Sequence, residues 1–294
     1  MASYRIFADA TIDLPDVMLD AGDVTIIPMT VDISGESYTI CGRESTIGNE
    51  DFYAMLAKGE IARTAQVTPN TYYQYFEEVF QQGQDALLIS FSSGLSKSYE
   101  ASLVCAEKIR EDYPGRKLYC IDSICASGGH AILVDAAIRR QKEGYTIEEL
   151  AKWVEENKYK VDTLLTVDEL DTLLRGGRVS RTSATVGTML NIKPVIHINW
   201  EGKLIPVKKI RGRKKAIEYF ASEFKIHWNG SDDMVIVGYG TDQGEALILR
   251  DMIMADGGTE TVELVTIGPV IGAHTGGTVI ALYYFNKEVR VNSN

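Results

Sequence analysis

The sequence is poor in the residues that build metal sites and disulfide frameworks. Its 294 residues include four cysteines and four histidines. No two cysteines form a C-x-x-C pair, and the histidines are scattered, without an H-E-x-x-H motif or a cysteine cluster beside them. Because zinc sites need such closely spaced ligands, we expect no metal. A chain of this length folds without covalent staples, so reduced, buried thiols are expected.

Long apolar runs are also absent. The longest, such as residues 279–285, fall far short of the roughly 20 residues that a membrane-spanning helix needs. The opening Met1-Ala2-Ser3-Tyr4-Arg5 leads directly into a strand-like segment, without the basic start and apolar stretch of a secretion signal. We therefore expect no transmembrane helix and a cytoplasmic protein.

Motifs for nucleotide binding and serine hydrolysis are missing as well. Residues 238–244 read G-x-G-x-x-x-G, one residue too long for the dinucleotide fingerprint, whose third glycine permits close packing of helix on strand. The chain has no G-x-x-x-x-G-K-[ST] loop and no G-x-S-x-G elbow. No cofactor is predicted.

Positive charge is scarce except in one segment. The formal net charge is −11, yet residues 171–215 hold eleven basic residues against two acidic ones. The overall acidity argues against nucleic acid as a partner. The basic segment is either a solvated lysine-rich surface or a docking face for an acidic partner or a membrane surface.

The first half alternates short apolar runs with longer helical periodicity, which predicts βαβ units around a largely parallel sheet. Strands are expected at residues 4–8, 24–33, 86–91 and 117–121. Helices are expected to start near Tyr99 and Ala126, and Thr68-Pro69 predicts another helix start. An amphipathic helix at residues 146–157 is expected to close this part.

The second half is typical of a mixed α+β domain. Strands are expected at residues 161–167, 194–198, 204–209, 234–238, 261–267 and 279–285. Helices are expected at residues 168–174, 183–191, 214–227 and 243–255. The sequence thus predicts a two-domain α/β protein, with residues 1–160 as the N-terminal α/β domain and residues 161–294 as the C-terminal α+β domain.

Three polar loops are candidates for a ligand site: residues 64–69, residues 92–98, which follow a strand, and residues 268–277, between two late strands. Ligands of open parallel sheets gather beyond the carboxyl ends of the strands, where helix N-termini favour anions. The hydroxyls of Thr64 and Ser93 can donate hydrogen bonds to a carboxylate or phosphate. They can equally cap the helices that follow.

Seven local motifs stand out in the sequence: residues 9–15 (DATIDLP), 64–66 (TAQ), 92–99 (SSGLSKSY), 122–123 (DS), 168–178 (DELDTLLRGGR), 190–194 (LNIKP) and 272–276 (GAHTG). Together they resemble the DegV family, whose members bind fatty acids as subunits of bacterial fatty-acid kinases. Three positions differ from the family pattern, namely Ala10 for serine, Lys97 for glycine and Gly277-Thr278 for proline-glycine.

The resemblance implies two α/β domains with a long-chain fatty acid between them. It implies that Thr64, Ser92 and Ser93 lie at the carboxylate, with His274 and Thr275 at the same polar end. The basic residues Arg175, Arg178, Lys208 and Arg211 would then face a partner kinase, which phosphorylates the carboxylate with its own ATP. The chain would be a non-catalytic carrier.

Two other functions remain open at this point. One is a serine esterase or acyl-transfer enzyme with Ser93 as nucleophile and His274 as base, for which no acidic partner of the histidine is recognisable. The other is a lipid-sensing interaction module with no kinase involved.

Overall fold

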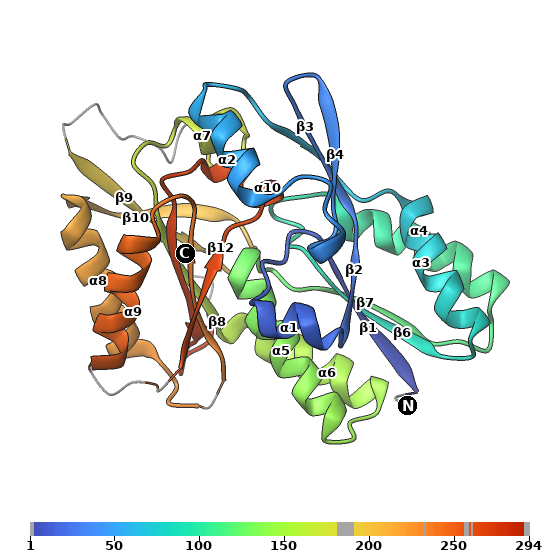
Figure 1. The fold of residues 1–294 in the computed structure, drawn as a ribbon. Helices are drawn as coiled ribbons and strands as arrows, with labels where there is room; N and C mark the ends of the chain where they lie inside the picture. The colour runs from blue at the N-terminus through green and yellow to red at the C-terminus, as the bar shows by residue number, and fades with distance from the viewer. Residues whose placement is uncertain (1–2, 181–190, 232, 256–258, 260, 291–294) are drawn as a thin grey trace.

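A computed structural model describes residues 3–180, 191–231, 233–255, 259 and 261–290. Within these ranges the chain is an α/β protein with three sheets, and its first and second halves lie side by side (Figure 1). The α-helices are α1 (Asp16–Ala21), α2 (Asn49–Ala57), α3 (Pro69–Gln81), α4 (Ser98–Asp112), α5 (Ser127–Lys142), α6 (Ile147–Asn157), α7 (Asp171–Arg175), α8 (Arg213–His227), α9 (Gln243–Ala255) and α10 (Pro269–Thr275).

The first sheet is fully parallel, as predicted. Its strands are β1 (Tyr4–Asp9), β2 (Val24–Ile27), β6 (Asp85–Ser90) and β7 (Leu118–Asp122), in the order β2-β1-β6-β7. Helices α3, α4 and α5 begin within a residue of the predicted starts. Thr68 caps α3, because its side chain accepts a hydrogen bond from the backbone N–H of Thr71, and a capping box of Thr146 and Glu149 opens α6.

The predicted strand at residues 24–33 is in fact two strands. Pro28 interrupts it, because proline has no N–H for the sheet ladder. The chain then leaves the parallel sheet and forms β3 (Met29–Ile33), the centre of a small antiparallel sheet with β4 (Glu36–Ile40) and β5 (Arg63–Ala65). This small sheet was not predicted.

The third sheet is mixed and belongs to the second half, for which the sequence predicted an α+β domain without the strand directions. Its order is β10-β9-β8-β13-β11-β12, and only β11 and β12 run parallel. The strands are β8 (Val161–Thr166), β9 (Ile192–Ile198), β10 (Leu204–Arg211), β11 (Val235–Tyr239), β12 (Val262–Thr266) and β13 (Ile280–Phe285). Strand β10 forms one edge, and a register shift interrupts its pairing with β9 between Pro206 and Lys208.

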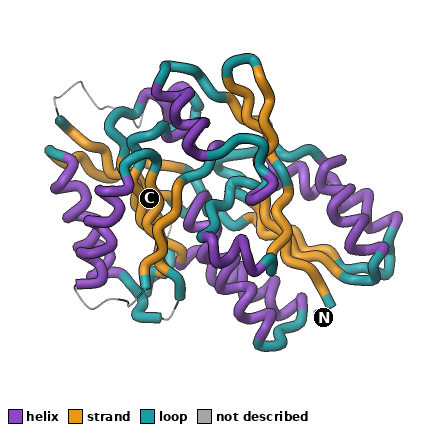
Figure 2. Tube along the Cα trace, in the orientation of Figure 1, coloured by secondary structure: helices purple, strands orange, loops and turns teal. Residues whose placement is uncertain are grey.

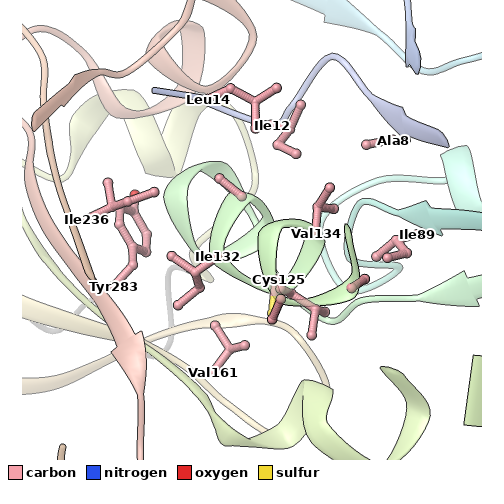
Figure 3. Packing of buried hydrophobic residues seen from close by; sticks show 14 of the residues in the cluster. Ala8, Ile12, Leu14, Ile89, Cys125, Ile132, Val134, Val161, Ile236 and Tyr283 are labelled. Carbon is pink, nitrogen blue, oxygen red and sulfur yellow. The ribbon is translucent and has the colours of Figure 1, made fainter. Parts of the chain in front are cut away.

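Helix α5 lies at the centre of the molecule, between the parallel sheet and the mixed sheet (Figures 1 and 2). From Ser127 to Ile138 every residue except Asp135 is buried, whereas the last turn of the helix is basic. Figure 3 shows Ile132 and Val134 of α5 among Ile89 of β6, Val161 of β8 and Tyr283 of β13. At Gly128 even a methyl group would overlap the Tyr283 ring, so a glycine is needed there.

Two further hydrophobic clusters lie on the sheet faces that point away from α5. Helices α3 and α4 pack on the parallel sheet through residues such as Phe7, Phe76 and Leu88. Helices α8 and α9 pack on the mixed sheet through residues such as Phe220, Leu249 and Tyr284.

Residues 268–277 were expected as a loop, but Pro269–Thr275 form α10, which packs against α2, β3, β5 and α7. The helix expected at residues 183–191 lies, except for Asn191, outside the described residues. A division near residue 160 stays a prediction, although the strands of the first two sheets precede it and those of the mixed sheet follow it.

Candidate functional site

A cavity of about 490 Å³ lies where the two halves meet. One side is formed by the loop after β6, the start of α5 and residues of β3 and β5. The other side is formed by β8, β9, β13 and α10. Its apolar lining includes Met29, Phe91, Leu165, Ile198, Ile271 and Tyr283. This size and lining are ordinary for a small-molecule site.

The Thr64 and His274 side chains form a hydrogen-bonded pair in the wall of this cavity. Thr64 Oγ1 on β5 lies 2.8 Å from His274 Nε2 on α10. Burial, assisted by the nearby Arg178 guanidinium, lowers the pKa of His274 to about 4. The imidazole is therefore neutral at neutral pH, and its other nitrogen, Nδ1, is buried without a partner among the described residues. The pair offers uncharged hydrogen-bonding groups to a ligand.

A second, outer cavity of about 370 Å³ adjoins the same pair. It shares Thr64, Arg178 and His274 with the first cavity, and adds Arg63 and Arg175. Arg178 is half-buried and donates from Nε to the Leu95 carbonyl at 3.2 Å and from a guanidinium N–H to the Gly176 carbonyl. Burial lowers its pKa. The Thr64–His274 pair thus stands between an apolar cavity and a basic one.

Ser92 and Ser93, in the loop that follows β6, have different environments. Ser93 lines the larger cavity, and its hydroxyl donates to Asp122 Oδ2 at 2.5 Å while its N–H donates to Oδ1 at 3.1 Å. Ser92 is fully buried behind this wall and donates to the Gly202 carbonyl at 2.8 Å. Neither serine caps α4, whose N-cap is Lys97.

Thr275 also lines the cavity, and its hydroxyl donates to the Ile271 carbonyl at 3.2 Å. The structure therefore brings four of the five predicted ligand residues, Thr64, Ser93, His274 and Thr275, to one cavity. Their contact with a ligand stays a prediction.

The cavity wall also holds polar residues that were not predicted as ligand residues, among them Gln66 and Ser96. Ser96 Oγ lies 3.0 Å from Ser98 Oγ, which accepts a hydrogen bond from the Val67 N–H. Both residues belong to motifs that carried the family resemblance. These motifs indicated the loops that form the cavity wall, but the sequence could not show which hydroxyl of the loop faces the cavity.

A buried carboxylate, Asp13, was missed as well. It accepts hydrogen bonds from Ser127 Oγ at 2.5 Å and from the Gly268 N–H at 2.8 Å. Burial raises its pKa to about 6. Asp13 thereby ties the loop after β1 to the start of α5 and to the residue that precedes α10, the helix that carries His274.

The four predicted docking residues divide into two groups. Arg175 and Arg178 line the outer cavity, whereas Lys208 and Arg211 are exposed on the edge strand β10. Lys208 Nζ lies 4.0 Å from the centre of the Tyr219 ring. Part of the basic segment is neutralised by carboxylates outside it, since Lys193 pairs with Asp168 and Arg213 with Glu245.

The described residues hold no group of three or more His, Cys, Asp or Glu side chains able to bind a metal ion. Within the same ranges, no helix has the length and apolar character needed to cross a membrane.

A family model described as "Uncharacterised protein, DegV family" matches residues 3–287. The chain belongs to the DegV family. A DegV domain-containing protein of Clostridium perfringens is 34% identical over 285 residues, which cover 97% of this chain and 98% of that protein.

Solved DegV structures share the fold. A DegV family protein from Thermus thermophilus, described for its fatty acid binding, is 26% identical with a TM-score of 0.85, covering 97% of this chain and 99% of that one. The Streptococcus pneumoniae Fatty Acid Kinase (Fak) B3 protein, loaded with linoleic acid, has a TM-score of 0.82 at 20% identity, covering 96% of this chain and 99% of that one. At that identity, the likeness to the second protein shows the fold alone.

Proposed function

We propose that this DegV protein binds one long-chain fatty acid between its two halves and presents the carboxylate to an ATP-dependent partner kinase. The observation that carries the proposal is the neutral Thr64–His274 pair in the wall of an apolar cavity. Fatty acid binding by the Thermus thermophilus relative supports the choice of ligand.

The tail and the carboxylate of the proposed fatty acid contribute differently to binding. A tail of about 15 methylenes gains roughly 0.8 kcal/mol per buried group, a gross total of about 12 kcal/mol before ordering costs. The hydrogen bond between Thr64 and His274 uses one of their two donors, so the pair supplies one remaining donor for the carboxylate, and Ser93 and Thr275 complete the wall. The tail therefore anchors the ligand and the polar end orients it.

The kinase is the less direct part of the proposal. It rests on the resemblance of residues 168–178 and the other motifs to fatty-acid kinase subunits. Arg175, Arg178, Lys208 and Arg211 are the proposed docking residues, with transient contact to a membrane surface as a further use of the same charge. We propose the cytoplasm as the compartment, since the kinase uses ATP.

The esterase alternative is disfavoured by geometry. A serine nucleophile needs its base within hydrogen-bond reach. Instead, Ser93 donates to Asp122, and His274 pairs with Thr64. These are two separate pairs and form no relay. We therefore propose that the chain performs no catalysis of its own.

Mass spectrometry of lipid extracted from freshly purified protein tests the ligand. We expect about one equivalent of free fatty acid. If extraction repeatedly yields none and added fatty acid does not bind, the proposal is wrong. Incubation with activated acyl esters tests the alternative, because only an esterase would turn them over or form an acyl-serine. Acyl-phosphate formation with the kinase and ATP separates a carrier from a lipid-sensing module.

A further inference from the structure

The Ser93 hydroxyl already has a partner within the protein. It donates its single hydrogen to Asp122 Oδ2 at 2.5 Å, the short distance expected when the acceptor is a carboxylate. The backbone N–H groups of Ser93 and Ile124 donate to the other oxygen, Asp122 Oδ1, at 3.1 Å and 2.9 Å. Three hydrogen bonds therefore hold the Asp122 carboxylate in one orientation beside Ser93.

The fold brings these two residues together at one edge of the parallel sheet. Asp122 is the last residue of β7, and Ser93 lies in the loop that follows the neighbouring strand β6. Because the carboxyl ends of parallel strands lie at the same edge of a sheet, the two residues meet there. Asp122 also accepts from the N–H two positions further on, that of Ile124, as aspartate does in tight turns. The pair is thus built entirely from the first half of the chain.

The hydroxyls at the polar end of the larger cavity are engaged with protein acceptors, whereas an ionised carboxylate can only accept hydrogen bonds. The Thr64–His274 pair keeps one donor after its own hydrogen bond. The Thr275 hydroxyl is donated to a backbone carbonyl of α10. Ser93 lines the cavity, but because its hydrogen is donated to Asp122 it offers a ligand only the lone pairs of its oxygen. A carboxylate that approaches Ser93 must therefore draw this hydrogen away from Asp122.

We infer that Asp122 competes with the fatty-acid carboxylate for the Ser93 hydrogen and thereby sets the head-group selectivity of the site. The inference rests on the proposed function and names a positioning residue for it. A primary amide both accepts and donates. It can accept from the Thr64–His274 pair and donate to Ser93 Oγ while the bond from Ser93 to Asp122 stays intact. Asp122 therefore narrows the preference for a carboxylate over an amide with the same tail.

Asp122→Asn tests the competition with almost no change in shape. The amide oxygen in place of Oδ1 still accepts from the N–H groups of Ser93 and Ile124, whereas the amide nitrogen in place of Oδ2 donates to Ser93 Oγ. The Ser93 hydrogen is then free for a ligand. We expect the affinity for stearate to rise about 10-fold, the size of one hydrogen bond to a charged group, while the affinity for stearamide does not rise.

A double-mutant cycle shows whether Asp122 acts through Ser93 or only through its charge. In the wild-type background, Ser93→Ala should change stearate affinity less than about 3-fold, because the hydroxyl merely exchanges one acceptor for another. In the Asp122→Asn background, Ser93→Ala should weaken stearate binding about 10-fold, because the freed hydrogen is lost. Displacement of a fluorescent fatty acid measures all four proteins. Equal effects of Ser93→Ala in the two backgrounds would overturn the inference.

Asp242→Asn is the matched control, because Asp242 also accepts from a backbone N–H, that of Glu245 at 3.1 Å, and lines neither cavity. It should leave both affinities unchanged, and thermal unfolding shows which variants fold. If Asp122→Asn does not fold, Ser93→Ala alone decides, since a loss of about 10-fold or more in stearate affinity would show that Ser93 donates despite Asp122. If stearate binds but the cycle shows no coupling, the inference is wrong and the proposed function stands. If stearate does not bind the wild type, both are wrong.

Discussion

The Thr64 hydroxyl and the His274 imidazole lie 2.8 Å apart although 210 positions separate them in the chain. Thr64 belongs to the small antiparallel sheet of the first half, and His274 to a short helix of the second. The contact exists because α10 packs on β3, β5 and α2. The proposed carboxylate end is therefore a product of how the two halves join.

Thr64→Val removes the hydroxyl with little change in volume. We expect fatty-acid affinity to fall about 10 to 100-fold, because a hydrogen bond to a charged group contributes roughly 1.5 to 3 kcal/mol. Binding should remain measurable because the tail term is larger. Titration measures the loss, with Thr39→Val as the control on an exposed position of β4. Equal affinities of the two variants would remove Thr64 from the site.

Neighbouring glycines offer a matched pair of variants. A methyl group at Gly176 would lie 2.6 Å from His274 Nδ1, whereas one at Gly177 would meet nothing within 4 Å. Gly176→Ala should displace the imidazole and weaken fatty-acid binding. Gly177→Ala should cost only stability, about 1 kcal/mol, because φ is +71° there. Titration and thermal unfolding of both variants check this, and equal binding by both would contradict it.

Protonation of His274 should oppose folding. Its pKa falls from the ordinary 6.5 to about 4, so between these values the unfolded chain binds a proton that the native protein does not. The free energy of unfolding should therefore decrease as the pH falls from about 6.5 to 4, by at most about 3.5 kcal/mol at roughly 1.4 kcal/mol per pKa unit. His274→Gln should remove this contribution, as urea unfolding at several pH values would show. An unchanged slope would be evidence against it.

The pKa shift of Asp13 should have the opposite effect on how the free energy of unfolding depends on pH. Burial raises its pKa from 3.8 to about 6, so in that window the native protein holds a proton that the unfolded chain releases. Its contribution favours folding as the pH falls from about 6 to 4. In Asp13→Asn the loss of stability on acidification should consequently be steeper than in wild type. The same urea series measures it, and a shallower slope would contradict the assignment.

The exposed pair Lys208 and Arg211 tests docking to the kinase. Reversing both charges to glutamate should slow acyl-phosphate formation at subsaturating carrier and leave fatty-acid binding intact, since attraction between charged faces acts mainly on association. The effect should shrink as salt is raised, because the Debye length is about 8 Å at physiological ionic strength. Lys152→Glu on α6, also exposed, is the control. An unchanged rate would exclude this face.

Much of the parallel core could be predicted because its signals are local. Apolar runs such as residues 86–91 alternate with capped helices, and Thr68-Pro69 and Thr146 mark their starts by side-chain hydrogen bonds within three residues. The loop at residues 92–98 follows β6, so the position of Ser93 at the end of a strand was also predictable.

What could not be predicted depends on contacts between distant residues. The sequence predicted a loop at residues 268–277, a segment with four glycines, yet Gly272 lies within α10 and is needed where the Phe52 and Tyr53 side chains approach within 3 Å of any added methyl group. The hydrogen bond from Ser93 to Asp122 and the burial of Asp13 also depend on residues that are distant in the sequence. Local sequence patterns identified the residue types of the site, but the partner of each side chain required the fold.

The position of α10 has a consequence for synthesis of the protein. Ribosomes release the chain from its N-terminus, so β5 and Thr64 emerge long before residues 269–275. A nascent chain that has already formed the parallel sheet still lacks the imidazole opposite Thr64, and the mixed sheet still lacks β13, its link between β8 and β11. If the chain binds a fatty acid as proposed, we therefore expect loading only after translation has passed α10, because the proposed carboxylate site is incomplete before then.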